Sequence, residues 1–302
     1  MIVETKALTK SFGKKVVLDG LDLAVPEGAV YGLIGSNGSG KSTTIKLLLN
    51  IIRAGSGQAS VLGVECRRLR PEHFQRIGYV SENQEMPEWM TAGAFLRYLR
   101  PFYPNWDSER ESDLIDRFAL PLEQPIRALS RGQRMKVALA SSLAYRPELL
   151  ILDEPFSGLD PLVREELIEG LLGEEGSLTI LLSSHDLADV EGLVSHVGFL
   201  DRGRIAFSEE MRDLTERFRE IEVVLEGAPP LPARWPEAWL GAKTAAAVVR
   251  FVDSRFTGEA SLREVQGVFP SARDIRVHPM SLRAIFVALA KQERERERQA
   301  AA

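Results

Sequence analysis

The chain of 302 residues has one cysteine, Cys66, and no excess of positive charge, since its formal net charge is −5. One cysteine excludes a disulfide within the chain and fits a reducing cytosol. The negative balance gives no support for general nucleic-acid binding, so no nucleic-acid partner is expected.

Long apolar runs are also lacking. The longest, around residues 149–152 and 178–182, have the length of a strand and not that of a bilayer span. Residues 1–6 lack the apolar core of a secretion signal. We therefore expect a chain that does not insert in a membrane by itself, so that any membrane association would run through a partner.

The composition is that of an ordinary globular protein, with 44% hydrophobic and 27% charged residues. Strand-like and helix-like segments alternate from residue 28 to about residue 205, which predicts an α/β fold with a mostly parallel sheet covered by helices. Residues 2–8 and 16–25 flank a turn at residues 13–15 and predict an antiparallel β-subdomain beside that core.

Residues 86–128 break the alternation with several prolines and two amphipathic stretches, at 92–99 and 108–118. They predict a helical insertion within a helical subdomain of about residues 86–145. Its aromatic side chains, Trp89 and Trp106 among them, are expected to form either the core of that subdomain or a docking surface.

The chain changes character near residue 215. Segments 221–225 and 247–252 are typical of strands, and segments 261–268 and 281–290 are typical of helices. We therefore expect a small α+β appendage over residues 215–302, after a main domain over residues 1–214.

Residues 35–42 read Gly-Ser-Asn-Gly-Ser-Gly-Lys-Ser and fit the phosphate-binding pattern G-x-x-x-x-G-K-[ST]. The segment before the loop reads as a buried strand and the segment after it as a helix, which places an anion at a helix N-terminus. Lys41 can reach the β- and γ-phosphate oxygens, and the Ser42 hydroxyl can ligate Mg²⁺. The candidate nucleotide-binding residues of this loop are Ser36, Asn37, Gly38, Ser39, Gly40, Lys41, Ser42 and Thr43.

A second phosphate-site element is the apolar run 149–152, which ends in two carboxylates, Asp153 and Glu154. Ligands of open α/β sheets lie at such strand ends. Asp153 is a candidate to hold Mg²⁺, and Glu154 is a candidate to polarise the water that attacks the γ-phosphate.

The third element is Leu-Ser-Arg-Gly-Gln at residues 129–133, which resembles the LSGGQ signature of ATP-binding cassette (ABC) proteins. The helix expected at 135–145 places Ser130 and Gly132 near a helix N-terminus, which favours anions. With the loop at 35–42 upstream and Asp153 downstream, the order of the motifs is similar to that of the ABC family over roughly residues 2–210.

The resemblance carries further residues with it. Phe12 is similar to the aromatic residue that stacks on adenine, Asp160 lies in a segment that resembles the D-loop, and His185 resembles the switch histidine at the γ-phosphate. In the signature, the resemblance implies nucleotide contacts for Ser130, Gly132 and Gln133.

Two positions depart from the family pattern. Arg131 stands where the signature usually has glycine, and its side chain is expected either to add charge near the nucleotide or to point to solvent. Glu82 stands where the Q-loop usually has glutamine, and its carboxylate could also coordinate Mg²⁺. Gln84 would substitute for the usual glutamine only in a shifted loop.

The resemblance implies ATP and Mg²⁺ as cofactors, ATP hydrolysis, and a head-to-tail dimer in which each ATP lies between the Walker motifs of one copy and the signature of the other. A homodimer docked on an integral membrane permease, on the cytoplasmic face of the cell membrane, is the expected assembly. Segments 81–84 and 155–164, with the appendage, resemble cassettes of ABC-2-type exporters. A soluble ABC ATPase of translation or DNA repair is the alternative, and a P-loop kinase or GTPase is disfavoured by the signature and His185.

Overall fold

The computed structural model describes residues 1–173, 178–187, 190–227, 232 and 235–300. It divides into two compact units, Met1–Glu209 and Glu210–Ala302. The division thus falls a little before the boundary expected between residues 214 and 215.

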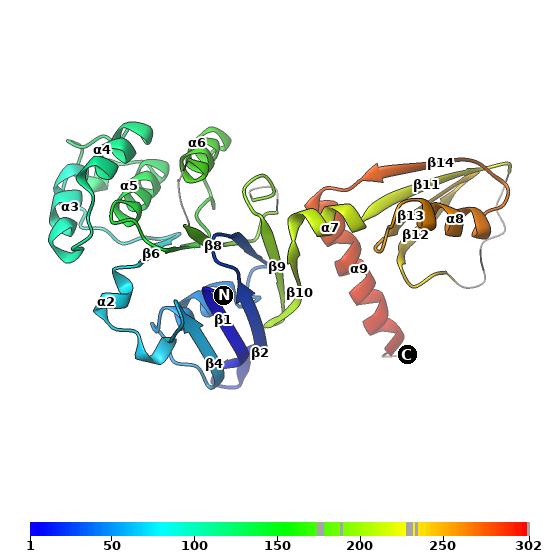
Figure 1. The fold of residues 1–302 in the computed structure, drawn as a ribbon, viewed down its shortest axis with the longest axis horizontal. Coiled ribbons are helices and arrows are strands. Elements are labelled where there is room, and N and C mark those ends of the chain that lie inside the picture. Colours follow the sequence, from blue (N-terminus) through cyan, green and yellow to red (C-terminus); the bar gives the residue numbers. More distant parts are fainter. Residues whose placement is uncertain (174–177, 188–189, 228–231, 233–234, 301–302) are drawn as a thin grey trace. The chain divides into compact units, whose positions relative to one another are not determined.

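The first unit is built on a six-stranded sheet that confirms the expected mostly parallel core (Figure 1). In spatial order its strands are β10 (Arg204–Glu210), β9 (His196–Asp201), β3 (Val30–Ile34), β8 (Thr179–Ser184), β7 (Leu149–Asp153) and β6 (Ile77–Ser81). β3 pairs in parallel with β8 and β9, and β7 pairs in parallel with β6 and β8. Every residue of β7 and β8 is buried, as expected for central strands covered on both faces.

A second sheet of the first unit is the expected antiparallel β-subdomain. Its spatial order is β2 (Lys15–Val25), β1 (Val3–Phe12), β4 (Ser56–Val61) and β5 (Val64–Glu65). The turn between β1 and β2 places Gly13 at a φ of +58°, a conformation that glycine adopts without a Cβ penalty. β4 was not expected, because its sequence Ser-Gly-Gln-Ala-Ser-Val lacks the apolar alternation of a typical strand.

One hydrophobic core joins the two sheets of the first unit. Leu21 and Val25 of β2 lie in the same buried cluster as Tyr31 and Leu33 of β3, together with Ile45 of the first helix. All five side chains are at most 1% exposed. The core therefore fixes the β-subdomain against the phosphate-binding loop, which lies between β3 and that helix.

The helices of the first unit are α1 (Lys41–Leu48), α2 (Pro71–Phe74), α3 (Ala92–Leu99), α4 (Ser108–Arg117), α5 (Arg131–Leu143) and α6 (Pro161–Leu172). Figure 1 shows α3, α4 and α5 gathered together, which confirms the expected helical insertion. Local caps explain where they begin: the Thr91 hydroxyl accepts from Ala94 N at α3, and the Asp107 carboxylate accepts from Arg110 N at α4.

The two tryptophans of the insertion differ in their exposure to solvent. Trp106 is half-buried, and its Nε1 donates to Glu111 Oε2 at 2.8 Å, so it belongs to the packing of the subdomain. Trp89 is 76% exposed, and Phe102 is 57% exposed. The exposed aromatic side chains of the insertion therefore include those of Trp89 and Phe102 and not that of Trp106.

The second unit is a small α+β fold with a four-stranded antiparallel sheet. Its elements are α7 (Met211–Arg217), β11 (Arg219–Leu225), β12 (Trp239–Ala245), β13 (Val248–Asp253), α8 (Glu259–Val268), β14 (Ala272–Pro279) and α9 (Leu282–Ala300), with spatial strand order β12-β13-β11-β14. Trp239 stacks on Phe251 with ring centroids 4.2 Å apart, and both rings pack with Val265 of α8 in one hydrophobic cluster. The charged sequence of β14 hid this strand from a search for apolar alternation.

No helix among the described residues combines the length and the apolarity that a bilayer crossing requires.

Candidate nucleotide-binding site

The phosphate-binding loop runs from the end of β3 at Ile34 to the start of α1 at Lys41. Two of its glycines have positive φ, +81° at Gly38 and +115° at Gly40. A Cβ on Gly40 would also lie 2.6 Å from the Leu18 side chain, so this position requires glycine. Gly40 caps α1 without a side-chain hydrogen bond, which leaves the N-terminal N–H groups of this helix available to an anion.

Lys41 is held inside the loop by three oxygen atoms. Its Nζ donates to Gly35 O at 2.7 Å and to Ser36 O at 3.3 Å, and it forms an ion pair with Glu154 Oε1 at 3.1 Å. The Lys41 side chain is only 5% exposed, so its charge is directed into the site and not into solvent.

Ser42 and Asp153 form the oxygen pair that was expected to hold Mg²⁺. Ser42 Oγ donates to Asp153 Oδ1 at 3.0 Å. Ser183, which pairs with Asp153 across β7 and β8, donates its hydroxyl to the same oxygen at 2.7 Å. Adjacent parallel strands thus fix the carboxylate from one side and leave it facing the start of α1.

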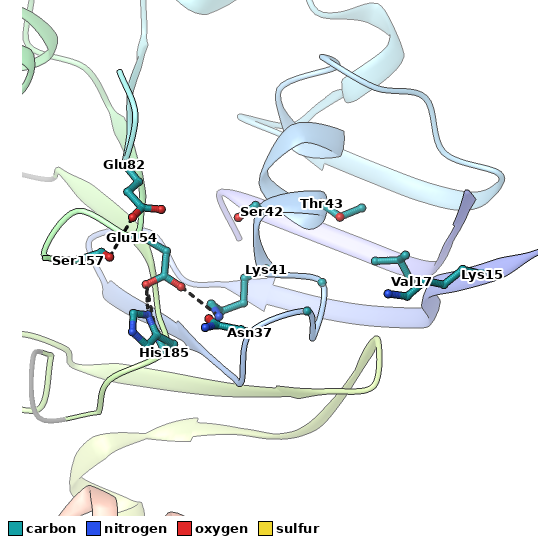
Figure 2. A pocket seen from close by; sticks show the side chains of 12 residues that line it. Lys15, Val17, Asn37, Lys41, Ser42, Thr43, Glu82, Glu154, Ser157 and His185 are labelled. Carbon is teal, nitrogen blue, oxygen red and sulfur yellow. Dashed lines mark hydrogen bonds and ion pairs between the residues drawn. The ribbon is translucent and has the colours of Figure 1, made fainter. Parts of the chain in front are cut away.

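Glu154, the expected general base, contacts both His185 and Lys41 (Figure 2). Its Oε2 is 2.7 Å from His185 Nδ1, and its Oε1 is the partner of Lys41. The Glu154 backbone has a φ of +53°, a conformation that costs a non-glycine residue about 1 kcal/mol or more. The Ser183 hydroxyl accepts the Glu154 N–H at 3.0 Å and supports this turn at the end of β7.

Glu82 follows the end of β6 and is tied to two other segments. Its Oε1 accepts a hydrogen bond from Arg131 Nη2 at 2.9 Å and another from Ser157 Oγ at 2.9 Å. Burial would raise the pKa of the Glu82 carboxyl, but these two bonds and the Arg131 charge outweigh it, so the pKa lies below its ordinary value. Gln84 does not line the nucleotide pocket, and its Oε1 accepts a hydrogen bond from Ser81 N at 3.2 Å.

Of these side chains, Lys41, Ser42, Glu82, Glu154 and His185 line one pocket of about 440 Å³, whereas Asp153 does not line it. Figure 2 shows them converging from the phosphate-binding loop, the end of β7 and the segment after β8. The lining residues are Lys15, Val17, Asn37, Gly38, Gly40, Lys41, Ser42, Thr43, Glu82, Glu154, Ser157 and His185. The pocket therefore unites most of the residues expected to bind and hydrolyse a nucleotide.

Three lining residues were not singled out by the motifs. Lys15 and Val17 come from β2, so they reach the pocket only because the antiparallel sheet packs beside the loop. Ser157 lies within the segment similar to the D-loop, and its hydroxyl donates a hydrogen bond to Glu82.

Several expected residues do not line this pocket. Phe12 is 50% exposed and lies opposite Lys15 in the β1–β2 register, which places it next to a lining residue. Ser130 caps α5, since its Oγ accepts from Gln133 N at 3.2 Å while Gln133 Oε1 accepts from Ser130 N at 2.9 Å. Asp160 caps α6 by accepting from Val163 N at 3.1 Å.

The signature helix begins earlier than the sequence indicated. α5 starts at Arg131, directly after the Ser130 cap, rather than at residue 135. Gly132 packs closely on α6, because a Cβ there would lie 2.6 Å from Val163 Cγ1. The Arg131 side chain is 44% exposed and forms an ion pair with Glu82. It therefore neither extends freely into solvent nor lines the pocket, but contacts a residue that does.

The residues present fit a magnesium nucleotide. Ser39 Oγ is buried without a hydrogen-bond partner beside the open N-terminus of α1. Among the described residues, no three His, Cys, Asp or Glu side chains are grouped around a metal position. Mg²⁺ commonly binds through one or two protein oxygens and completes its shell with water and substrate phosphates, which matches the pair Ser42 and Asp153.

Comparison with known proteins agrees with this geometry. The ABC transporter family model matches residues 18–157. The chain is 31% identical over 227 residues to the ABC transporter ATP-binding protein YtrB of Bacillus subtilis (strain 168), covering 74% of this chain and 77% of YtrB. It is 33% identical over 223 residues to the bacitracin transport ATP-binding protein BcrA of Bacillus licheniformis, covering 72% of this chain and 73% of BcrA.

A solved structure of the ATP-binding subunit of an ABC transporter superposes with a TM-score of 0.65 at 29% identity, covering 72% of this chain and 92% of that chain. Residues 18–157, which the family model matches, hold the loop at 35–42, the carboxylates at the end of β7 and the signature at the start of α5. The chain therefore belongs to the ABC transporter family, as one of its ATP-binding, ATP-hydrolysing subunits.

Proposed function

We propose that this ATPase subunit acts as a head-to-tail homodimer, binds ATP with Mg²⁺ at each of two composite sites, and powers export through an integral membrane permease. The observation that carries the proposal is that, within one chain, the signature residues are separated from the pocket. Lys41, Glu154 and His185 line the pocket, whereas the signature residues Ser130 and Gln133 cap α5 outside it. A second copy would bring its own signature to the open side of the pocket.

Each side chain of the pocket has a chemical task in this proposal. ATP supplies the reactive phosphoanhydride when it is bound. The Lys41 ammonium would bind phosphate oxygens, and Ser42 with Asp153 would hold the Mg²⁺ ion. Glu154 would accept a proton from the attacking water, and His185 at 2.7 Å would orient that carboxylate.

The ion pair between Lys41 and Glu154 suggests how the expected general base is kept engaged until a nucleotide binds. While Lys41 Nζ lies 3.1 Å from Glu154 Oε1, this ion pair occupies the carboxylate oxygen that would otherwise face a water molecule. A triphosphate would give Lys41 other anionic partners and free Glu154 for proton transfer. Binding of the substrate would therefore itself release the catalytic carboxylate.

The proposed role in export rests on the resemblance to one transport protein and on exposed aromatic side chains. BcrA is named for bacitracin transport, and this chain resembles it over 73% of its length. The exposed Trp89 and Phe102 of the helical insertion are the surface that we assign to the permease, which would hold the subunit on the cytoplasmic face of the membrane. Isolation of the native complex in mild detergent tests this assignment. An integral membrane protein should copurify, and ribosomes or DNA in its place would contradict a transport role.

The dimer can be tested with Glu154→Gln, which keeps the shape of the site but removes the base. This variant should bind ATP with Mg²⁺, hydrolyse it poorly and run as a dimer in size-exclusion chromatography with light scattering. His185→Ala at the same protein concentration is the matched control for loss of turnover. A Glu154→Gln chain that stays monomeric at micromolar concentration with ATP and Mg²⁺ would contradict the dimer.

A further inference from the structure

A pocket in the second unit lies outside the nucleotide site described above. It has a volume of about 580 Å³ and is lined by residues of β12, β13 and α9, with Glu220 of β11 and the turn before α9. It exceeds the nucleotide pocket of about 440 Å³ and lies within the size range of small-molecule sites. All of its lining residues belong to the unit Glu210–Ala302.

The inner part of this pocket is apolar. Leu240 of β12 lies at its floor and is 4% exposed, whereas the Phe251 ring is held in the cluster with Trp239 and Val265. Val252 adds to the strand side, and Val287 of α9, which is 40% exposed, lies on the helix side. Such a lining favours a ligand with a hydrocarbon segment, because its burial removes apolar surface from water.

The rim of the pocket is cationic. Lys243, Arg283 and Lys291 line it, and the ion pairs of the described residues include none that engages these three side chains. A fourth cation, Arg250, is neutralised by Glu222, to which its Nε donates at 2.6 Å. The only carboxylate in the described lining is that of Glu220. A concentration of positive charge on a chain with a net charge of −5 points to an anionic ligand group.

We propose that this pocket is a binding site for a single-chain amphiphilic organic anion, with a hydrocarbon tail on Leu240, Val252 and Val287 and an acidic head at Lys243, Arg283 and Lys291. A few charged groups around an apolar cavity are the usual arrangement by which small-molecule sites fix the orientation of a ligand. The concave floor between strands and helix suits one chain and not the flat surface of a bilayer. This inference is independent of the homodimer and the permease.

The test uses the full-length chain without nucleotide and decanoate below its critical micelle concentration. Isothermal titration calorimetry should detect saturable binding of decanoate, about tenfold or more tighter than binding of decyltrimethylammonium, because only the anion gains charge-assisted bonds at the rim. Equal binding of the two amphiphiles would overturn the proposal, and so would no binding of decanoate. Binding to phosphatidylglycerol vesicles alone would also overturn it, because the site would then be a membrane surface.

Variants locate the binding. Lys243→Glu combined with Arg283→Glu should weaken decanoate about tenfold or more, and Val287→Trp should block the cavity. Arg263→Glu on α8, an exposed cation outside the lining, is the matched control and should leave the affinity unchanged. Circular dichroism verifies that each variant is folded, and Lys291→Glu replaces the double variant if that one unfolds. Decanoate affinity that survives both the charge variants and Val287→Trp would overturn the assignment.

Discussion

The guanidinium of Arg131 donates a hydrogen bond to Glu82 Oε1 at 2.9 Å, which joins the two positions where this chain departs from the ABC pattern. Glu82 lines the nucleotide pocket, and Arg131 begins the signature helix. The two departures therefore compensate each other, since a carboxylate beside a phosphate site gains a cation that neutralises it.

The pair predicts opposite effects for single and double substitution. Arg131→Gly should raise the KM for ATP roughly fivefold, because the unpaired Glu82 carboxylate then repels the triphosphate. Adding Glu82→Gln should restore the KM toward that of the unaltered protein, since it removes the charge that Arg131 had balanced. Steady-state ATPase assays measure both, and a double variant no better than Arg131→Gly would show that the pair has no electrostatic role.

Lys41 and Glu154 should separate binding from chemistry. Lys41→Ala should weaken nucleotide binding, because it removes the cation that the loop directs into the pocket. Glu154→Gln should leave binding nearly intact and lower kcat about 100-fold or more, the usual effect of losing a general base. Nucleotide titration and single-turnover kinetics distinguish the two. A Glu154→Gln chain with normal turnover would remove Glu154 from the catalytic role.

Stability should respond to one methyl group on α6. A Cβ at Gly170 would lie 2.3 Å from the buried ring of Phe118, so Gly170→Ala should destabilise the first unit by about 1–3 kcal/mol through overpacking. Gly267→Ala on α8 is the matched control, because a Cβ there meets nothing within 4 Å. It should be neutral or stabilise by about 0.5–1 kcal/mol. Urea unfolding measures both, and equal effects would contradict the packing at Gly170.

Alkaline pH should weaken the fold in a way that depends on Cys66. Burial raises the pKa of the Cys66 thiol to about 12, and also raises the pKa of Tyr31 to about 12. Above about pH 9 the unfolded thiol loses its proton while the folded one keeps it, so the stability present below pH 9 falls as the pH rises. The contribution of Cys66 to the slope should approach ~1.4 kcal/mol per pH unit between about pH 9 and 10.

Cys66→Ala should reduce that slope, and the slope that remains should be confined to the upper end of the interval, where the unfolded side chain of Tyr31 begins to ionise. Denaturant titrations at closely spaced pH values measure the difference. A slope that is equal in both proteins would mean that the native thiol ionises as freely as the unfolded one.

The part of the site that lies on contiguous motifs could be predicted from the sequence. The loop at 35–42, the carboxylates after β7 and His185 after β8 each follow a strand, and the ends of neighbouring parallel strands necessarily meet at one edge. The helical insertion and the second unit were also visible as changes in composition.

What escaped prediction depends on tertiary packing. Lys15 and Val17 line the pocket only because β2 packs next to the loop, and neither carries a motif. The bond between Arg131 and Glu82 joins residues 49 positions apart. β4 is a polar strand and β14 is a charged strand at the edge of its sheet. Neither has the apolar alternation that a pattern search needs.

The composite site is tested most directly by mixing two inactive chains. Lys41→Ala disables the loop and keeps the signature, and Ser130→Asp keeps an N-cap acceptor but places negative charge where the triphosphate of a partner would lie. Each homodimer then lacks a complete site, whereas a mixed dimer has one site with an intact loop and an intact signature. We predict ATPase activity in the mixture well above that of either variant alone. No recovery on mixing, or normal activity of Ser130→Asp by itself, would contradict the head-to-tail dimer.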